Sequence, residues 1–224
     1  MDTRALQPAI HSVYEAFSEV PKPDDIEAHD QLISREEVDV LLETPLRALT
    51  EQQLVSFATN VLVMYGGVEH FLYFLPRILE LTVADDLAEV EVTLSRLKKA
   101  NWATWPASLR EPVKALIDQT FGLVTNEGLV HEIDEWLCAV GQCVDDLQPY
   151  LKILEKNASE ERLGELFCIN TRVYEGGMPE NPFWGNNPQT ASQVAAWMRT
   201  DPMRRVYQLS SVGLSRGPFN NSDY

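Results

Sequence analysis

The sequence lacks the features of a membrane-spanning or a secreted protein. It has no uninterrupted apolar run of about 18 residues, the length that a membrane-spanning helix needs. Its most apolar stretch, Val61 to Leu79, contains two glycines, a proline and several charged side chains, which predicts two buried helices and a turn. The amino-terminal segment has no basic region followed by an apolar core, so no signal peptide is expected. We therefore expect a cytoplasmic protein.

Cysteine is scarce, and the common catalytic motifs are missing. Cys138, Cys143 and Cys168 are the three cysteines, and no CxxC pair is present, which excludes the usual zinc-ribbon and thioredoxin motifs. Apolar neighbours at helical spacing predict that these thiols are free and buried in a reducing compartment. GxGxxG, GxxxxGK[ST], HExxH and GxSxG are also absent. The sequence therefore indicates no cofactor and favours a protein that is not an enzyme.

Basic residues are few in relation to acidic ones. The chain has 18 Lys and Arg against 34 Asp and Glu, which gives a formal net charge of −16. A protein that binds nucleic acid needs a basic face for the phosphates, and an anionic membrane surface attracts basic segments. We therefore expect neither nucleic acid nor a membrane as a partner. A basic protein, a cation or simple solubility remain as reasons for the charge.

The acidic side chains are concentrated toward the amino terminus. Residues 1–95 hold 18 acidic and 5 basic side chains, whereas residues 181–224 hold 2 acidic and 4 basic ones. Helix starts explain part of this excess, because Asp and Glu favour the first turn. The rest is either a solubilising surface or a docking face for a basic protein. The candidate docking residues are Asp24, Asp25, Glu27, Asp30, Glu36, Glu37, Asp39, Asp85, Asp86 and Glu89.

What the sequence does contain is a helical pattern along almost all of its 224 residues. Apolar residues recur every three or four positions, and runs of alternating β-branched residues are missing, which predicts an all-α fold of about ten helices. Ser34 and Glu37 have the spacing of a capping box, and Pro76 is expected to kink or end its helix. Short turns favour antiparallel pairs in a bundle-like or HEAT-like stack. We expect a single helical domain, 1–224, with a possible sub-division near 100–106, a loop at 176–189 and a frayed tail at 213–224.

Four segments of the chain have distinctive sequences. They are the GGVEHFLYFLPRILEL stretch within Pro45 to Leu81, the WATWP break within Asn101 to Pro106, Asp145 to Leu151 and Ser192 to Met198. With these segments the chain resembles a family of uncharacterised bacterial all-helical proteins, and the first two segments are the most specific. Members of this family often carry closely spaced cysteines before the second helix, but Ile26 to Ser34 has none. The resemblance implies a helical fold and no established activity.

One set of residues has the spacing of a weak metal site. Glu127, His131 and Glu135 are four residues apart, so on a continuous helix they would share a face and could hold a cation. Gly128 is expected to interrupt that helix, and no second histidine is near. A solvated acidic face is the alternative, and it is favoured.

Four further residues stand out from their surroundings. His70 lies in an apolar helix and is either a general base or, as is more common, a hydrogen-bonded histidine at the edge of the core. Arg77 is expected to be structural, in a salt bridge with Glu69 or Glu80 or on helix-terminal carbonyls. Phe183 and Trp184 in the long loop either fold back onto the helices or form an exposed anchor for a partner.

These observations lead to three functional hypotheses. The first is an acidic cytoplasmic binding protein, an immunity protein that neutralises a basic bacterial toxin by occluding its active site. The second is an enzyme of unrecognised class that could use a metal held by Glu127, His131 and Glu135. The third is a helical scaffold or adaptor that receives a peptide in a groove between stacked helices. The absence of catalytic motifs and the strong acidity favour the first.

Overall fold

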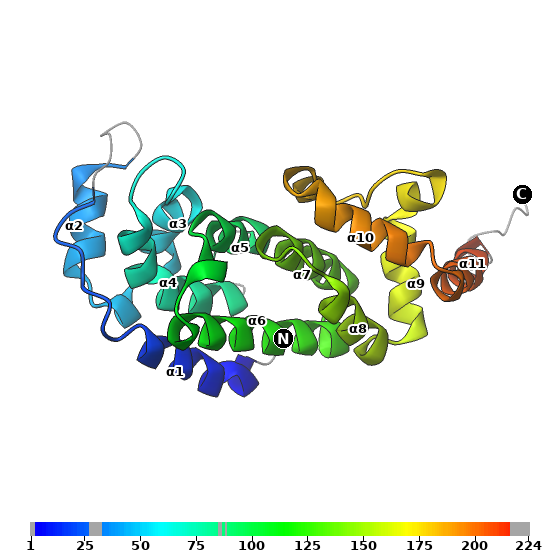
Figure 1. Ribbon diagram of the computed structural model, residues 1–224, viewed down its shortest axis with the longest axis horizontal. Helices are drawn as coiled ribbons and strands as arrows, with labels where there is room; N and C mark the ends of the chain where they lie inside the picture. The colour runs from blue at the N-terminus through cyan, green and yellow to red at the C-terminus, as the bar shows by residue number, and fades with distance from the viewer. Residues whose placement is uncertain (1–2, 27–32, 85–86, 88, 216–224) are drawn as a thin grey trace, which may run out of the picture. The chain divides into compact units, whose positions relative to one another are not determined.

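The computed structural model of the protein describes residues 3–26, 33–84, 87 and 89–215 (Figure 1). This part of the chain forms 11 α-helices and five short 3-10 helices, and no β-strand occurs within it. The all-α prediction is therefore confirmed. None of the described helices is both long enough and apolar enough to cross a membrane.

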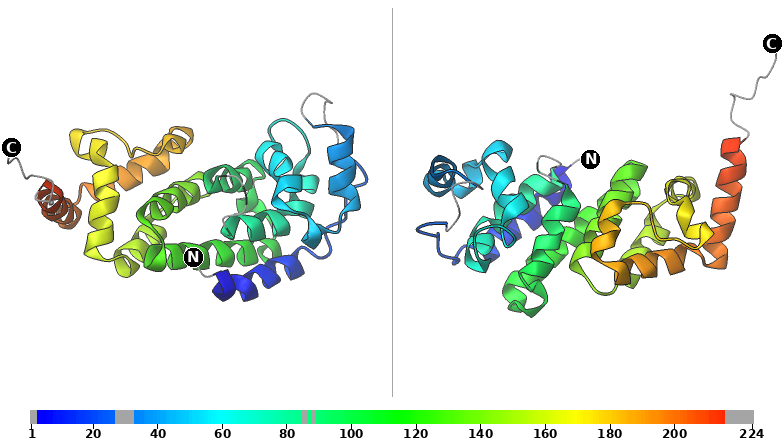
Figure 2. Two further views of the ribbon diagram at one scale, coloured as in Figure 1. Left: turned by 180° about the vertical axis from the view of Figure 1, so that it is seen from behind. Right: turned by 90° about the horizontal axis from the view of Figure 1, so that it is seen from above.

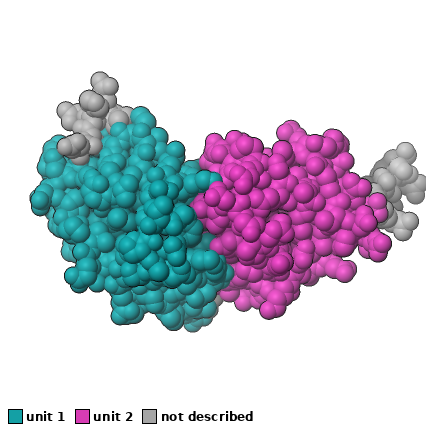
Figure 3. Space-filling model, viewed as in Figure 1, with its two compact units in different colours: residues 1–120 teal, residues 121–224 magenta. Residues whose placement is uncertain are grey.

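The chain divides into two compact units, coloured separately in Figure 3. Unit 1 is Met1–Thr120 and unit 2 is Phe121–Tyr224, so the division falls inside one helix, α6 (Ala107–Glu127). The single helical domain expected from the sequence stays a prediction. Unit 1 contains η1 (Thr3–Leu6), α1 (Gln7–Ala16), α2 (Arg35–Glu43), η2 (Leu46–Ala48), α3 (Glu51–Asn60), α4 (Val68–Val83), α5 (Val90–Lys99) and η3 (Trp102–Thr104). Unit 2 contains α7 (Val130–Cys143), α8 (Gln148–Asn157), α9 (Glu160–Ile169), η4 (Thr171–Glu175), η5 (Pro182–Asn186), α10 (Pro188–Met198) and α11 (Asp201–Ser215).

Helix α4 is the centre of the core of unit 1. It contacts α1, α3, α5 and η2, and Phe71, Phe74 and Leu75 are fully buried in it. The helix runs through Pro76 to Val83, so Pro76 is not the boundary that the sequence allowed. A proline inside a helix removes one hydrogen bond and crowds the preceding turn. Burial of the surrounding apolar side chains offsets that local cost.

The helix starts follow the capping signals in the sequence. The Ser34 hydroxyl accepts a hydrogen bond from the Glu37 amide (3.2 Å), and the Glu37 carboxylate accepts one from the Ser34 amide (2.8 Å), which confirms the predicted capping box. Ser159 caps α9 through the Arg162 amide in a similar way (3.3 Å). These bonds satisfy backbone donors that have no partner inside the helix.

Unit 2 is built on α7 and α9. Helix α7 contacts η5, α9 and α10, and α11 packs across α9 (Figure 2). Gly164 of α9 allows this contact, since a methyl group there would overlap with the Ser210 hydroxyl of α11. The loop expected at 176–189 contains η5 and the start of α10. Helix α11 includes residues 213–215 of the predicted tail, and residues 216–224 lie outside the described part.

Candidate functional site

The outward side of α2 carries the largest described group of candidate docking residues. Glu36, Asp39 and Glu43 are spaced by three and four residues, so they share one face of the helix, and Val40 lies among them. The opposite face is buried through Val38, Leu41 and Leu42. Asp24 and Asp25 are exposed in the segment that precedes α2. We call Asp24, Asp25, Glu36, Asp39 and Glu43 the acidic face.

Arg35 joins the two parts of the acidic face. Its Nη1 lies 2.7 Å from Asp25 Oδ1, and its Nε lies 2.9 Å from Asp39 Oδ1. The hydrogen bond from Arg35 is the main reason that the pKa of Asp25 lies below its usual range. All three side chains are about half exposed or more, so these pairs contribute little to stability. Their effect is to hold two carboxylates in fixed places on the surface.

The remaining carboxylates of this region differ in their local roles. Glu37 belongs to the capping box. The pKa of its carboxyl group is lowered mainly by the hydrogen bond from the Ser34 backbone amide and further by the bond from the Ser34 side chain. Asp24, Glu36 and Glu43 are exposed and make no hydrogen bond or ion pair to the described residues. They are therefore the members of the acidic face that can be changed without loss of a structural contact.

Val40 adds an apolar contact point to the acidic face. It is 39% exposed at the middle of the α2 surface that carries Glu36, Asp39 and Glu43. Protein interfaces commonly have an apolar centre surrounded by a charged rim. The arrangement can therefore hold a basic surface that also offers an apolar side chain.

The other acidic candidates do not extend this surface. Glu27, Asp30, Asp85 and Asp86 lie outside the described residues. Glu89 is exposed at the residue before α5, and it thus belongs to a different element from α2. The structure therefore groups the candidates on and before α2, and Glu89 is not part of that group.

His70 has partners for both ring nitrogens. Its Nδ1 accepts a hydrogen bond from the Gly67 amide (2.8 Å), which places the proton of the neutral ring on Nε2, and Nε2 donates to the Asp25 carbonyl (2.8 Å). The Glu69 carboxylate lies 3.0 Å from Nδ1, where it would pair with the protonated ring. These residues and Gly66 line a polar pocket of about 500 Å³. The geometry favours a histidine that ties the segment before α2 to the start of α4, rather than a general base.

Arg77 is part of a chain of polar contacts inside unit 1. Its Nε donates to the Leu49 carbonyl (2.8 Å), and its Nη1 donates to Glu80 Oε2 (2.7 Å), as the sequence predicted. The same Glu80 oxygen accepts a hydrogen bond from the Tyr14 hydroxyl (2.6 Å). Burial and the neighbouring Glu80 raise the pKa of Tyr14, so this phenol stays neutral. The guanidinium of Arg47 then lies over the Tyr14 ring, 3.5 Å from its centre.

The weak metal candidate is not assembled in the structure. Glu127 is the last residue of α6, and His131 and Glu135 belong to α7, which begins at Val130. Gly128 lies between the two helices, so the three side chains do not share one continuous helix face. Within the described part of the chain, no group of three His, Cys, Asp or Glu side chains is placed to hold a metal ion.

Trp184 folds back into unit 2. Its side chain is 3% exposed, and it packs against Gly141 of α7, where an added methyl group would lie 2.5 Å from Cζ3 of the indole. The alternative of an exposed anchor is therefore wrong for Trp184. Phe183 is partly exposed, and its carbonyl accepts a hydrogen bond from Gln142 (3.1 Å). The loop that carries both residues is held against α7 by these contacts.

A half-buried carboxyl group lies on another part of α7. Asp134 accepts hydrogen bonds from the side-chain amides of Asn170 (2.8 Å) and Asn181. Burial raises the pKa of Asp134, and the two amides offset part of that shift. Asn170 also accepts a bond from the Glu180 amide (2.7 Å). The carboxyl group thus organises the segment after α9, and no basic side chain of the described residues pairs with it.

Sequence reasoning missed three residues that shape these sites. Arg35 and Arg47 each contact a residue that lies ten or more positions away in the chain. Val40 is exposed, although the helical pattern does not decide whether this valine faces the core or the solvent. No local motif indicates the Arg47–Tyr14 pair. The charge pattern could have found Arg35, because it is four residues before Asp39, a spacing that favours ion pairs on a helix.

Comparisons of the chain with protein-family models, with curated proteins and with solved structures found no match. The resemblance to a family of uncharacterised bacterial helical proteins therefore stays a prediction.

Proposed function

We propose that the protein is an acidic binding protein that docks on a basic protein partner through the acidic face. The observation that carries this proposal is the surface of α2, where Glu36, Asp39 and Glu43 surround the exposed Val40. Asp24 and Asp25 extend the negative charge beyond the helix, and Arg35 is the basic residue that contacts it. Such a surface accelerates the encounter with a basic protein and disfavours acidic ones.

The partner that we propose is a bacterial toxin domain, which the protein neutralises in the cytoplasm as an immunity protein. Toxins that act on nucleic acids or nucleotides have cationic clefts, because their substrates are polyanions. A rigid acidic helix can cover such a cleft and exclude the substrate. The net charge of −16 supports the same idea, since long-range attraction raises the association rate.

The test begins with the genes that flank the one that encodes this chain. We expect an adjacent, co-transcribed reading frame that ends in a basic toxin domain, and co-expression of this protein should restore growth to cells that produce that domain. The purified domain is then the probe for binding. If the neighbouring genes encode no basic domain, or if co-expression does not restore growth, the immunity function is rejected.

A triple variant tests the acidic face itself. We would replace Asp24, Glu36 and Glu43 by Lys, since none of them has a structural partner among the described residues. The association rate with the toxin domain at low salt should fall by a factor of about ten or more. The matched control replaces the exposed Glu160, Glu161 and Glu165 of α9, which changes the net charge equally. If both variants slow association equally, the net charge of the protein and not the acidic face determines the association rate.

A further inference from the structure

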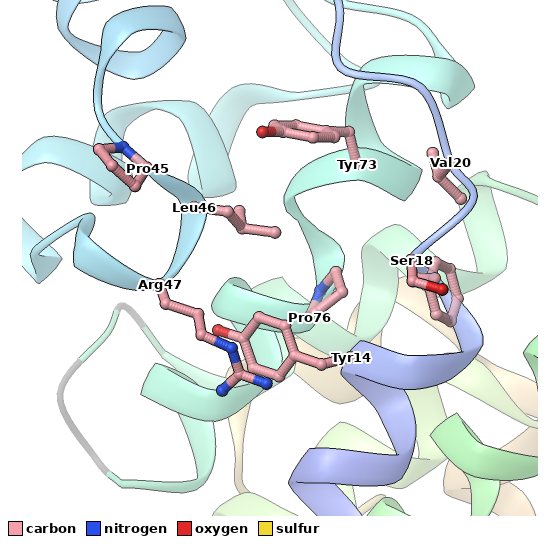
Figure 4. A pocket seen from close by; sticks show the side chains of 9 residues that line it. Tyr14, Ser18, Val20, Pro45, Leu46, Arg47, Tyr73 and Pro76 are labelled. Atoms are coloured by element: carbon pink, nitrogen blue, oxygen red, sulfur yellow. The ribbon is translucent and has the colours of Figure 1, made fainter.

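A second site in unit 1 has a different character from the acidic face. A pocket of about 330 Å³ lies between the end of α1, the 3-10 helix η2 and the middle of α4. Figure 4 shows Leu46 and Tyr73 facing this space from η2 and α4, with Pro76 and the Tyr14 ring on its lower side. Most of the lining is apolar or aromatic. Its volume lies at the lower end of the range for small-molecule pockets.

Arg47 places one positive charge at the edge of the pocket. Its guanidinium lies flat over the Tyr14 ring (Figure 4), 3.5 Å from the ring centre. Stacking covers a face of the guanidinium and leaves the N–H groups at its edge available, and no hydrogen bond or ion pair from the described residues uses them. Arg47 is exposed, so its donors are within reach of a ligand.

The position of this charge is fixed by the contacts behind it. Tyr14 donates to Glu80, Glu80 accepts from Arg77, and Arg77 donates to the Leu49 carbonyl, all within 2.8 Å. Both donors reach Glu80 Oε2, and within the described part of the chain no ion pair joins Glu80 to Arg47. The ring beneath the guanidinium is therefore held in place before any ligand arrives, which lowers the entropic cost of binding.

We propose that this pocket binds a small carboxylic acid with an apolar, preferably aromatic, body. The carboxylate pairs with the edge of the Arg47 guanidinium, a geometry that allows two parallel hydrogen bonds. The apolar body lies against Leu46, Tyr73 and Pro76. The pocket offers a single guanidinium, and the Glu80 carboxylate lies nearby. It therefore suits a ligand with one negative charge better than a phosphate. At about 30 Å³ for each water-sized volume, 330 Å³ holds a ligand of about ten heavy atoms.

Phenylacetate has the required size and charge, and phenylacetamide is its neutral counterpart of the same shape. Titration of the full chain, followed by the backbone amide signals of Leu46, Arg47 and residues 73–75 in NMR spectra, gives a dissociation constant for each. We expect phenylacetate to bind and phenylacetamide to bind at least about tenfold more weakly, because charge-assisted hydrogen bonds are roughly twice as strong as neutral ones. Equal affinity for the two compounds, or no shift of these signals with phenylacetate, would overturn the proposal.

Variants of Arg47 separate its charge from its shape. Arg47→Gln should weaken phenylacetate binding by about tenfold or more, and Arg47→Lys should lose part of the affinity, since a lysine has no planar fork. Arg110→Gln is the control, because Arg110 is a partly exposed arginine of unit 1 that does not line the pocket. A dissociation constant that stays unchanged in Arg47→Gln, or that rises equally in Arg110→Gln, contradicts the assignment. This site does not depend on the proposed docking function.

Discussion

The contact between Gly141 and Trp184 makes a sharp prediction about stability. Gly141 lies inside α7, where alanine normally stabilises a helix by about 1 kcal/mol relative to glycine. In this chain the new methyl group would lie 2.5 Å from Cζ3 and 2.8 Å from Cη2 of the Trp184 indole. Atoms cannot approach so closely, so the indole must move or the helix must shift. We therefore expect Gly141→Ala to destabilise the protein.

The magnitude can be bounded from the geometry. Overpacking a well-filled core costs about 1–3 kcal/mol, and the helix propensity of alanine returns about 1 kcal/mol of that. Complete expulsion of the indole would cost about 4–6 kcal/mol, from roughly 150–250 Å² of buried aromatic surface at about 25 cal/mol/Å². Because the ring can shift without leaving the core, we expect the overpacking cost to dominate, with a net loss of up to about 2 kcal/mol in the free energy of unfolding.

A second substitution shows whether the indole is the cause. Trp184→Phe removes the outer ring atoms that meet the methyl group, and it also removes the buried indole N–H, which has no hydrogen-bond partner among the described residues. In this background Gly141→Ala should become neutral or stabilising by up to about 1 kcal/mol. Urea denaturation followed by far-ultraviolet circular dichroism gives the four free energies. The same loss in both backgrounds would refute the reasoning.

Three further predictions concern other contacts. Burial raises the pKa of Asp134. The stability that this carboxyl group contributes is therefore present below the ordinary Asp pKa of about 3.9, and it is lost as the pH rises through the raised pKa. Asp134→Asn should flatten this pH dependence when the free energy of unfolding is measured across that pH range. Gly164→Ala should destabilise the chain by about 1–3 kcal/mol, and Ser210→Gly should restore most of the loss if the two residues collide as the geometry requires. Tyr14→Phe removes the hydrogen bond to Glu80 and should cost about 1.5–3 kcal/mol in chemical denaturation, whereas no cost would mean that Arg77 alone satisfies this carboxylate.

The parts of the fold that the sequence predicts well are those that local chemistry decides. The Ser34–Glu37 capping box and the interruption at Gly128 depend on residues a few positions apart, and both occur as expected. Pro76 shows the limit of such rules, because its helix continues where packing outweighs the lost hydrogen bond. Local rules decide when a helix starts or stops on its own, and the surrounding core decides when a local penalty is tolerated.

The candidate sites were less predictable because they combine distant residues. The acidic residues of α2 could be found from the sequence, since helical spacing alone puts Glu36, Asp39 and Glu43 on one face. Arg47 and Tyr14 meet only because η2 and α1 both pack on α4. Nothing in the periodicity of either segment indicates that meeting, so a pocket with a stacked guanidinium could not be inferred before the fold was known.

The close approach of α9 and α11 also has an evolutionary consequence. Since a side chain at position 164 and the Ser210 hydroxyl compete for the same space, neither position can change freely while the helices keep their distance. In related chains with this packing, a residue larger than glycine at 164 should occur together with a glycine at 210, or with a change in the helix spacing. The two positions are thus expected to co-vary as a pair, and this covariation would identify homologues that keep the carboxyl-terminal helix docked.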